Sequence, residues 1–321
     1  MEQNSIDLTA FADKMNLLRK ELHSVIVGQD EAIDLILTSI IADGHVLIEG
    51  VPGVAKTLLA RLLAKLIDAK FSRIQFTPDL MPSDVLGTTV YNTATSEFEF
   101  HKGPAFGEII LADEINRAPA KTQAALFEVM EERRADIDGT THDMGPLYTI
   151  IATQNPVEQE GTYPLPEGQL DRFLMKIRMG YPSADDEFEI LNRHKEHPAM
   201  TKLDDVRPVI SNDELLSMRA MLAKVIVDPS LIRYIVDIVQ LSRKARAVLL
   251  GASPRASVAM MQTACAHALL DGRYFVTPDD IKIVAVPVLS HRLMLTAEAQ
   301  MDGFTEEKVA ARILEKVEVP K

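Results

Sequence analysis

A glycine-rich segment in the first part of the chain ends in a lysine and a threonine. Residues 50–57 read Gly-Val-Pro-Gly-Val-Ala-Lys-Thr. Glycines let successive backbone N–H groups turn toward an anion, and the start of a helix adds positive potential there. Lys56 can then reach the β- and γ-phosphates of ATP, and the Thr57 hydroxyl can bind Mg2+. The predicted nucleotide-binding residues are Gly50, Val51, Pro52, Gly53, Val54, Ala55, Lys56, Thr57 and Leu58.

The segment departs from the usual phosphate-loop pattern at one position, because Ala55 replaces the glycine before the lysine. The methyl group of alanine disfavours positive φ. We expect helix-like backbone geometry at this position, which alanine tolerates. The alternative interpretation is a glycine-rich turn that caps a helix and leaves Lys56 on the surface. An apolar run before the segment and a helical pattern after it favour the phosphate loop.

An acidic pair follows a second apolar run. Residues 109–112 read Ile-Ile-Leu-Ala and lead directly into Asp113 and Glu114. A buried parallel strand would deliver both carboxylates to the sheet edge that carries the phosphate loop. Asp113 can then complete the metal site, and Glu114 can orient and polarise an attacking water. The alternative is a solvated acidic turn, which the upstream phosphate loop makes less favourable.

A polar amide ends the next predicted strand, where residues 147–153 run into Gln154, Asn155 and Pro156. We expect Asn155 to emerge between the first strand and the acidic strand. An amide in that place can hydrogen-bond a γ-phosphate or the attacking water. The alternative is a plain Asn-Pro turn.

Three arginines are candidates for completing the site: Arg117, Arg172 and Arg255. An arginine supplied by a neighbouring subunit accelerates phosphoryl transfer by roughly 10³–10⁵. Arg172 comes close to the start of the predicted fifth strand, at an edge that we expect to lie away from its own phosphate loop. It would then reach a γ-phosphate only on an adjacent subunit. The alternative for each arginine is a surface ion pair, which for Arg172 would involve the adjoining Asp171.

These residues must be positioned by alternating strands and helices. Apolar runs predict a parallel sheet with helices on both faces, an α/β fold. Two segments, 88–102 and 134–143, instead have the pattern of β-hairpins, and Asp138-Gly139 is a strong hairpin turn. The predicted strands are 45–49, 71–76, 108–112, 147–153 and 173–177, and predicted helices include 6–23 and 57–69.

The pattern becomes helical after Pro182, where strand signals nearly vanish. A chain of 321 residues also suggests about two domains. We therefore predict an α/β domain at 1–182 and an all-helical domain at 183–321, with a hinge near Pro182 on which the second domain moves. The predicted helices of the second domain are 213–225, 229–247, 255–270, 278–289 and 306–317.

Composition disfavours several classes of protein. The net charge is −13, there is no tryptophan, and no run of five basic residues occurs. These features argue against nucleic-acid binding. Cys265 is a single cysteine in an apolar stretch, so we expect a buried, inert thiol. We see neither a signal-peptide pattern nor 18 consecutive apolar residues, and expect a cytoplasmic location without membrane insertion.

Taken together, the chain resembles the MoxR family of AAA+ ATPases, in the clade with a β-hairpin inserted in the second core helix. Alanine before the lysine is usual in that family, and the resemblance extends over nearly the whole chain. The matching segments are Ile26–Asp30 (IVGQD), Glu49–Thr57 (EGVPGVAKT), Asp113–Thr122 (DEINRAPAKT), Ala152–Pro156 (ATQNP), Leu165–Phe173 (LPEGQLDRF) and Ser253–Ala256 (SPRA).

The resemblance implies a P-loop AAA+ core followed by a helical lid. It makes Asp113 and Glu114 the Walker B pair and Asn155 sensor 1. Arg172 looks like the finger that acts in a neighbour's site, and Arg255 looks like sensor 2. The remaining assignments are Arg117 as a further catalytic candidate and Val27 and Gly28 as the border of the adenine.

The family also implies partners. Its members are thought to form hexamers and to work with von Willebrand A-domain proteins in chaperone-like maturation or metal insertion. We therefore expect a chaperone-type ATPase. Two alternatives stay open: a nucleic-acid motor, since relatives in the same clade unwind DNA, and a module that holds ATP with little turnover. The charge argues against the first, and the presence of both Lys56 and Glu114 argues against the second.

Overall fold

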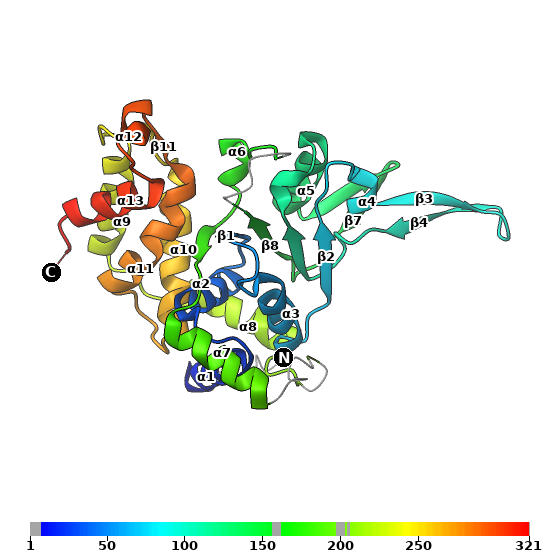
Figure 1. Ribbon diagram of the computed structural model, residues 1–321, viewed down its shortest axis with the longest axis horizontal. Coiled ribbons are helices and arrows are strands. Elements are labelled where there is room, and N and C mark those ends of the chain that lie inside the picture. The colour runs from blue at the N-terminus through cyan, green and yellow to red at the C-terminus, as the bar shows by residue number, and fades with distance from the viewer. Residues whose placement is uncertain (1–7, 156–161, 197–202, 204–205, 321) are drawn as a thin grey trace.

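A five-stranded parallel sheet forms the centre of the first lobe in the computed structural model, which describes residues 8–155, 162–196, 203 and 206–320 (Figure 1). All four strand pairings in it are parallel, as predicted. The strand order is β2-β5-β8-β1-β9. The strands are β1 (Val46–Gly50), β2 (Phe71–Gln75), β5 (Ile109–Asp113), β8 (Thr149–Gln154) and β9 (Met175–Met179).

Side chains of the sheet alternate between two apolar cores, because successive residues of a strand point to opposite faces. On β1, Val46 and Ile48 join the core that contains α2 and α3, whereas Leu47 joins the core that contains α5. Both faces of the central strands are therefore covered, which explains their continuous apolar runs. The helices of this lobe are α1 (Leu8–Val25), α2 (Asp30–Ile41), α3 (Lys56–Leu66), α4 (Pro82–Leu86), α5 (Ala120–Glu132) and α6 (Glu167–Leu170). Helix α7 (Ala184–Glu196) comes after Pro182 and lies against the end of α1, where Arg193 Nη1 donates to the His23 carbonyl oxygen at 3.0 Å.

Both predicted hairpins are present. The first extends well away from the body of the molecule (Figure 1). The second turns at Asp138 and Gly139, which both have positive φ, 49° and 79°, as a tight hairpin turn requires. The first hairpin comprises β3 (Gly87–Asn92) and β4 (Glu97–Lys102), and the second β6 (Arg134–Ile137) and β7 (Thr140–Asp143).

The second lobe is mainly helical, but the prediction of an all-helical domain is wrong because it contains two strands. Two short strands, β10 (Val248–Leu250) and β11 (Met294–Leu295), pair in an antiparallel arrangement. Strands of three and two residues are too short to produce a readable alternation. The buried Cys265 lies in this lobe, and burial raises the pKa of its thiol to about 11. The helices are α8 (Asn212–Met221), α9 (Pro229–Ser242), α10 (Pro254–Leu270), α11 (Pro278–Leu289), α12 (Ala297–Met301) and α13 (Glu306–Lys316).

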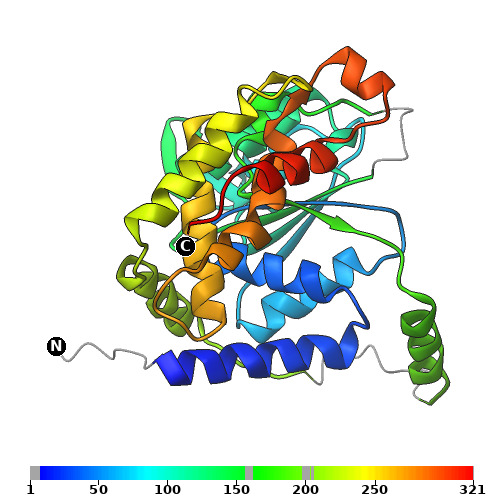
Figure 2. The same cartoon turned by 90° about the vertical axis from the view of Figure 1, so that its left-hand side faces the viewer.

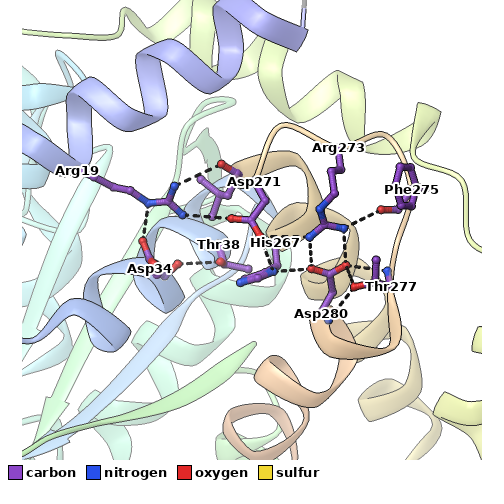
Figure 3. A network of polar contacts seen from close by, with 10 residues as sticks. Arg19, Asp34, Thr38, His267, Asp271, Arg273, Phe275, Thr277 and Asp280 are labelled. Carbon is purple, nitrogen blue, oxygen red and sulfur yellow. Dashed lines mark hydrogen bonds and ion pairs between the residues drawn. The ribbon is translucent and has the colours of Figure 1, made fainter. Parts of the chain in front are cut away.

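The two lobes are packed on each other (Figure 2). Helix α10 contacts α1 and α2, and α11 contacts β9, so the larger apolar core continues from one lobe into the other. A polar network crosses the same boundary (Figure 3). In it, Arg19 of α1 pairs with Asp34 of α2 at 2.6 Å and with Asp271, directly after α10, at 3.9 Å. Among the helices of the described ranges, none is long and apolar enough to cross a membrane.

Candidate active site

The glycine-rich segment connects β1 to α3, as the phosphate-loop interpretation requires. Gly53 has φ of +86°, a conformation that glycine adopts without strain. The Lys56 ammonium group donates a hydrogen bond to the Gly50 carbonyl oxygen at 2.5 Å, so the lysine side chain folds back over the loop. No side chain caps the start of α3 in the described structure, and the N-terminus of this helix therefore faces the loop as a site for phosphate.

The prediction of helix-like backbone geometry at Ala55 is wrong. This residue has φ of 62° and ψ of 20°, which is left-handed and not helix-like. The methyl group crowds the following carbonyl in that conformation, at a cost of roughly 1–2 kcal/mol. The left-handed residue lets the chain turn sharply from the loop into α3. This requirement explains why glycine is the usual residue before the lysine.

The predicted metal ligands lie together. The Thr57 hydroxyl is 3.5 Å from Asp113 Oδ2, although the two residues come from α3 and β5. Thr153 of β8 donates a hydrogen bond to the other carboxylate oxygen, Oδ1, at 2.6 Å. Asp113 is buried, and its carboxylate is thereby fixed at the carboxyl end of the sheet. A hydroxyl and a buried carboxylate are oxygen donors of the kind that Mg2+ prefers, so these residues fit the ion.

Glu114 lies beside this pair and is held from three sides. Its backbone N–H donates to Thr153 Oγ1 at 2.9 Å, and its carboxylate accepts a hydrogen bond from Gln75 Nε2 at 3.0 Å. The Arg117 guanidinium lies 3.1 Å from the same carboxylate oxygen. The structure therefore places Arg117 next to Glu114, as an ion-pair partner of the acidic residue.

Asn155 occupies the predicted position. It follows β8, and β8 lies between the acidic strand β5 and the phosphate-loop strand β1. Its side chain is buried. The neighbouring Pro156 of the same motif lies outside the described residues.

Two residues that lie at this edge, Arg73 and Gln75 of β2, are not among those predicted from the sequence. Arg73 makes two contacts with Asp113 Oδ2, from Nη2 at 2.7 Å and from Nε at 3.2 Å. Gln75 contacts Glu114. Polar side chains at alternate positions at the end of a strand point to one face, and this spacing was the available signal.

The turn between α1 and α2 carries the residues expected to border the adenine. Gly28 has φ of +67°, and a Cβ atom there would lie 2.9 Å from the Asp186 carboxylate at the start of α7. Val27 precedes it and is half-buried. Gln29 Nε2 donates to the Gly180 carbonyl at 2.9 Å, directly after β9. This turn therefore lies at the carboxyl ends of the strands, on the same edge as the phosphate loop.

Arg172 lies at the opposite edge of the sheet. It lies in the loop before β9, and β9 pairs directly with β1, so the expected distance of Arg172 from the phosphate loop does not come from the strand order. The distance comes from the parallel direction of the two strands. β9 begins beside the start of β1, with Met175 opposite Val46, whereas the phosphate loop follows the end of β1. The Leu174 N–H, which donates to the His45 carbonyl at 2.8 Å, fixes this amino-end position.

Arg172 and Arg255 meet at one carboxylate, that of Glu131 in α5. Arg172 Nη1 contacts one oxygen, and Arg255 Nη2 contacts the other at 3.2 Å. The suggested ion pair of Arg172 with Asp171 is wrong, because Asp171 instead accepts from Arg292 Nε at 2.7 Å. The two arginines line a hollow of about 570 Å³, together with Asp43, Gly44, His45, Arg133, Asp171, Pro254 and Arg292.

Comparisons with known proteins identify the family to which the chain is similar. The ATPase family associated with various cellular activities (AAA) matches residues 45–175, and the AAA lid domain matches residues 240–315. The chain is 48% identical to YeaC of Bacillus subtilis, over 94% of this chain and 93% of that protein. It is 44% identical to the chaperone MoxR1 of Mycobacterium tuberculosis, over 94% of this chain and 81% of that protein.

A crystal structure of a protein from Cytophaga hutchinsonii, 42% identical, has a TM-score of 0.90 and covers 98% of this chain and 97% of that chain. Similarity at this level extends over the phosphate loop, the acidic strand and the helical lobe alike. The chain belongs to the MoxR family of AAA+ ATPases.

Proposed function

We propose that the chain couples Mg2+-dependent ATP hydrolysis to chaperone-like remodelling or maturation of a client protein. It would act as a homo-oligomeric ring, in this family a hexamer, with a von Willebrand A-domain partner. One observation carries the proposal. The phosphate loop and acidic pair lie at one edge of the sheet, and the two candidate arginines share Glu131 at the other edge. A chain divided in this way supports a site that is completed between subunits.

Within one subunit, each residue at the carboxyl edge has a defined task. Lys56 would neutralise the β- and γ-phosphates, and Thr57 and Asp113 would hold Mg2+, which when bound neutralises charge on the phosphate oxygens. Glu114 would orient and polarise the attacking water. Asn155 would hydrogen-bond that water or the γ-phosphate.

Between subunits, Arg172 and Arg255 would supply positive charge to the γ-phosphate of a neighbour. Charge that is aimed at the developing negative charge of the transition state is worth several kcal/mol. Their distance from their own phosphate loop, together with their common partner Glu131, supports action in trans for both arginines.

The test is specific activity across a dilution series, with sedimentation measured alongside. Activity should rise with protein concentration, and ATP should promote assembly by mass action. Arg172→Ala should keep the affinity for ATP within a few fold and lower turnover by roughly 10²-fold or more. The matched control is Arg134→Ala, since Arg134 forms an exposed ion pair with Glu132 and no other ion pair among the described residues. Activity that stays constant while the protein becomes monomeric would show that each chain is self-sufficient.

The partner is tested separately, because ATP turnover does not identify it. Capture with the Glu114→Gln variant in the presence of ATP should enrich a von Willebrand A-domain protein from cells that express this chain. A complex with nucleic acid, or turnover that DNA stimulates, would favour the motor interpretation instead.

A further inference from the structure

We propose that Glu131 is a positioning residue that binds Arg172 and Arg255 in the free subunit. Its carboxylate then occupies the position between the two arginines that a neighbour's γ-phosphate takes in the ring. This inference rests on the proposed role of both arginines in completing a neighbour's site. It adds a regulatory contact: each subunit carries a carboxylate that competes with the neighbour's phosphate for the two arginines.

The contacts of Glu131 resemble those of a bound phosphate. Each carboxylate oxygen contacts a different guanidinium group, Oε2 that of Arg172 and Oε1 that of Arg255. Arg172 comes from the loop before β9, and Arg255 from the first turn of α10, so the carboxylate links the core to the helical lobe. Anions that bridge guanidinium groups in this way are commonly carboxylates or phosphates.

Other nearby charges are already engaged elsewhere. Arg133 pairs with Asp43 at 2.9 Å, and Arg292 pairs with Asp171. In the described part of the chain, Glu131 is the one carboxylate paired with Arg172 or with Arg255. The two arginines therefore depend on this single anion until another arrives.

The resting arrangement is one that phosphate can displace. The side chains of Glu131 and Arg255 are 41% and 62% exposed, and ion pairs at such sites are weak. Arg172 Nε is buried and lacks a hydrogen-bond partner among the described residues, which is an unfavourable state for a donor. A γ-phosphate offers more charge and more acceptor oxygens than a carboxylate. Replacement of Glu131 by the γ-phosphate as the partner of the arginines therefore favours the assembled ring once the neighbouring subunit has bound ATP.

Glu131→Gln tests the inference, because glutamine keeps the shape of the side chain and removes its charge. Without the competitor, the protein concentration that gives half-maximal specific activity should fall by about twofold to tenfold, the range expected for two exposed ion pairs. Turnover at saturating protein and ATP should stay within about twofold, since the phosphate has already displaced Glu131 there.

Two further variants separate charge from packing. Glu132→Gln is the matched control, because Glu132 is the next residue of α5 and its ion-pair partner within the described ranges is the exposed Arg134 alone. It should leave the half-maximal concentration unchanged. Glu131→Asp keeps the negative charge and should remain close to wild type. A packing role would predict the reverse order, with the shortened aspartate affected more than the isosteric glutamine.

The outcomes distinguish this inference from the proposed function. Near-normal turnover in Arg172→Ala would overturn the proposed function and this inference with it. Loss of turnover in Arg172→Ala, combined with an unshifted half-maximal concentration in Glu131→Gln, would overturn only the role of Glu131. A large fall in maximal turnover of Glu131→Gln would also overturn it, because Glu131 would then be needed in the working ring.

Discussion

At the scale of single residues, the site combines groups that hold the nucleotide with groups that act on it. Lys56 lies in the phosphate loop, whereas Glu114 lies on the acidic strand and is positioned by Gln75, Arg117 and Thr153. Binding and hydrolysis should therefore respond separately to substitution.

Lys56→Ala should lose affinity for ATP, because it removes the cation that faces the β- and γ-phosphates. Glu114→Gln should bind ATP like the wild type and lower turnover by roughly 10²-fold or more, because an amide polarises water poorly. Equilibrium binding of a fluorescent ATP analogue and a single-turnover assay measure the two effects. Turnover near the wild-type value in Glu114→Gln would remove this carboxylate from the mechanism.

Ala55 gives a second prediction at this scale. Ala55→Gly should raise the free energy of unfolding by about 0.5–1 kcal/mol. The substitution relieves the strain of the left-handed conformation, and this gain exceeds the free-energy cost of the greater entropy that glycine gives the unfolded chain. The control is Ala60→Gly in the middle of α3, which should lower it by about 1 kcal/mol or more. Urea denaturation measures both. If Ala55→Gly destabilises the protein as much as Ala60→Gly does, the left-handed geometry is not that of the free protein in solution.

At the scale of elements, the start of α11 depends on one buried carboxylate (Figure 3). Asp280 accepts hydrogen bonds from Arg273 Nη2 at 2.6 Å and from the Thr277 N–H at 2.7 Å, and His267 Nδ1 lies 2.7 Å away. Burial alone would raise the pKa of Asp280, but these hydrogen bonds outweigh it and hold the pKa well below its usual range.

A lowered pKa in the folded state means that the ionised carboxylate stabilises the fold above its unfolded pKa of about 3.9. That contribution should be lost progressively as the pH falls below about 4. Asp280→Asn should be less stable than the wild type at neutral pH and should lose this part of the acid dependence. Asp279→Asn, at the exposed neighbouring position, should follow the wild-type curve. Denaturant titrations between about pH 2 and 7 make the comparison, and parallel curves for wild type and Asp280→Asn would contradict it.

At the scale of the whole molecule, the lobes are joined through the residues that hold the arginines. Arg292 of the helical lobe is buried, with its side chain 4% exposed, and donates to Asp171 Oδ1 and to the Phe173 carbonyl, both at 2.7 Å. The loop that carries Arg172 is thus fixed to the lobe that carries Arg255. Motion of that lobe about the region near Pro182, which stays a prediction, would move both arginines together.

Action in trans gives a prediction for mixed assemblies. Lys56→Ala subunits have an intact Arg255, and Arg255→Ala subunits have an intact phosphate loop, so a mixture of the two should regain activity. Neither variant alone should be active. A mixture of Lys56→Ala with Glu114→Gln is the control, because each of these lacks a group of its own nucleotide site. Absence of recovery in the first mixture, with mixed rings demonstrated by native mass spectrometry, would show that Arg255 acts on its own subunit's nucleotide.

The groups at the carboxyl edge of the sheet could be predicted from the order of residues alone. The phosphate loop, Asp113, Glu114 and Asn155 follow apolar runs, and parallel strands bring their ends to one edge whatever the remaining packing. The hairpin at Asp138-Gly139 was equally predictable, because two adjacent residues with positive φ specify a tight turn. Such features depend on residues close together in the chain.

Contacts between residues far apart in the chain could not be predicted and became known from the folded arrangement. Glu131, Arg172 and Arg255 share a contact because α5, the loop before β9 and α10 converge at the amino edge, and no periodicity encodes that convergence. Arg172 therefore pairs with Glu131 and not with the adjoining Asp171. The left-handed Ala55 has the same origin, because the backbone must satisfy the fixed positions of both β1 and α3, and alanine's own preference is overruled.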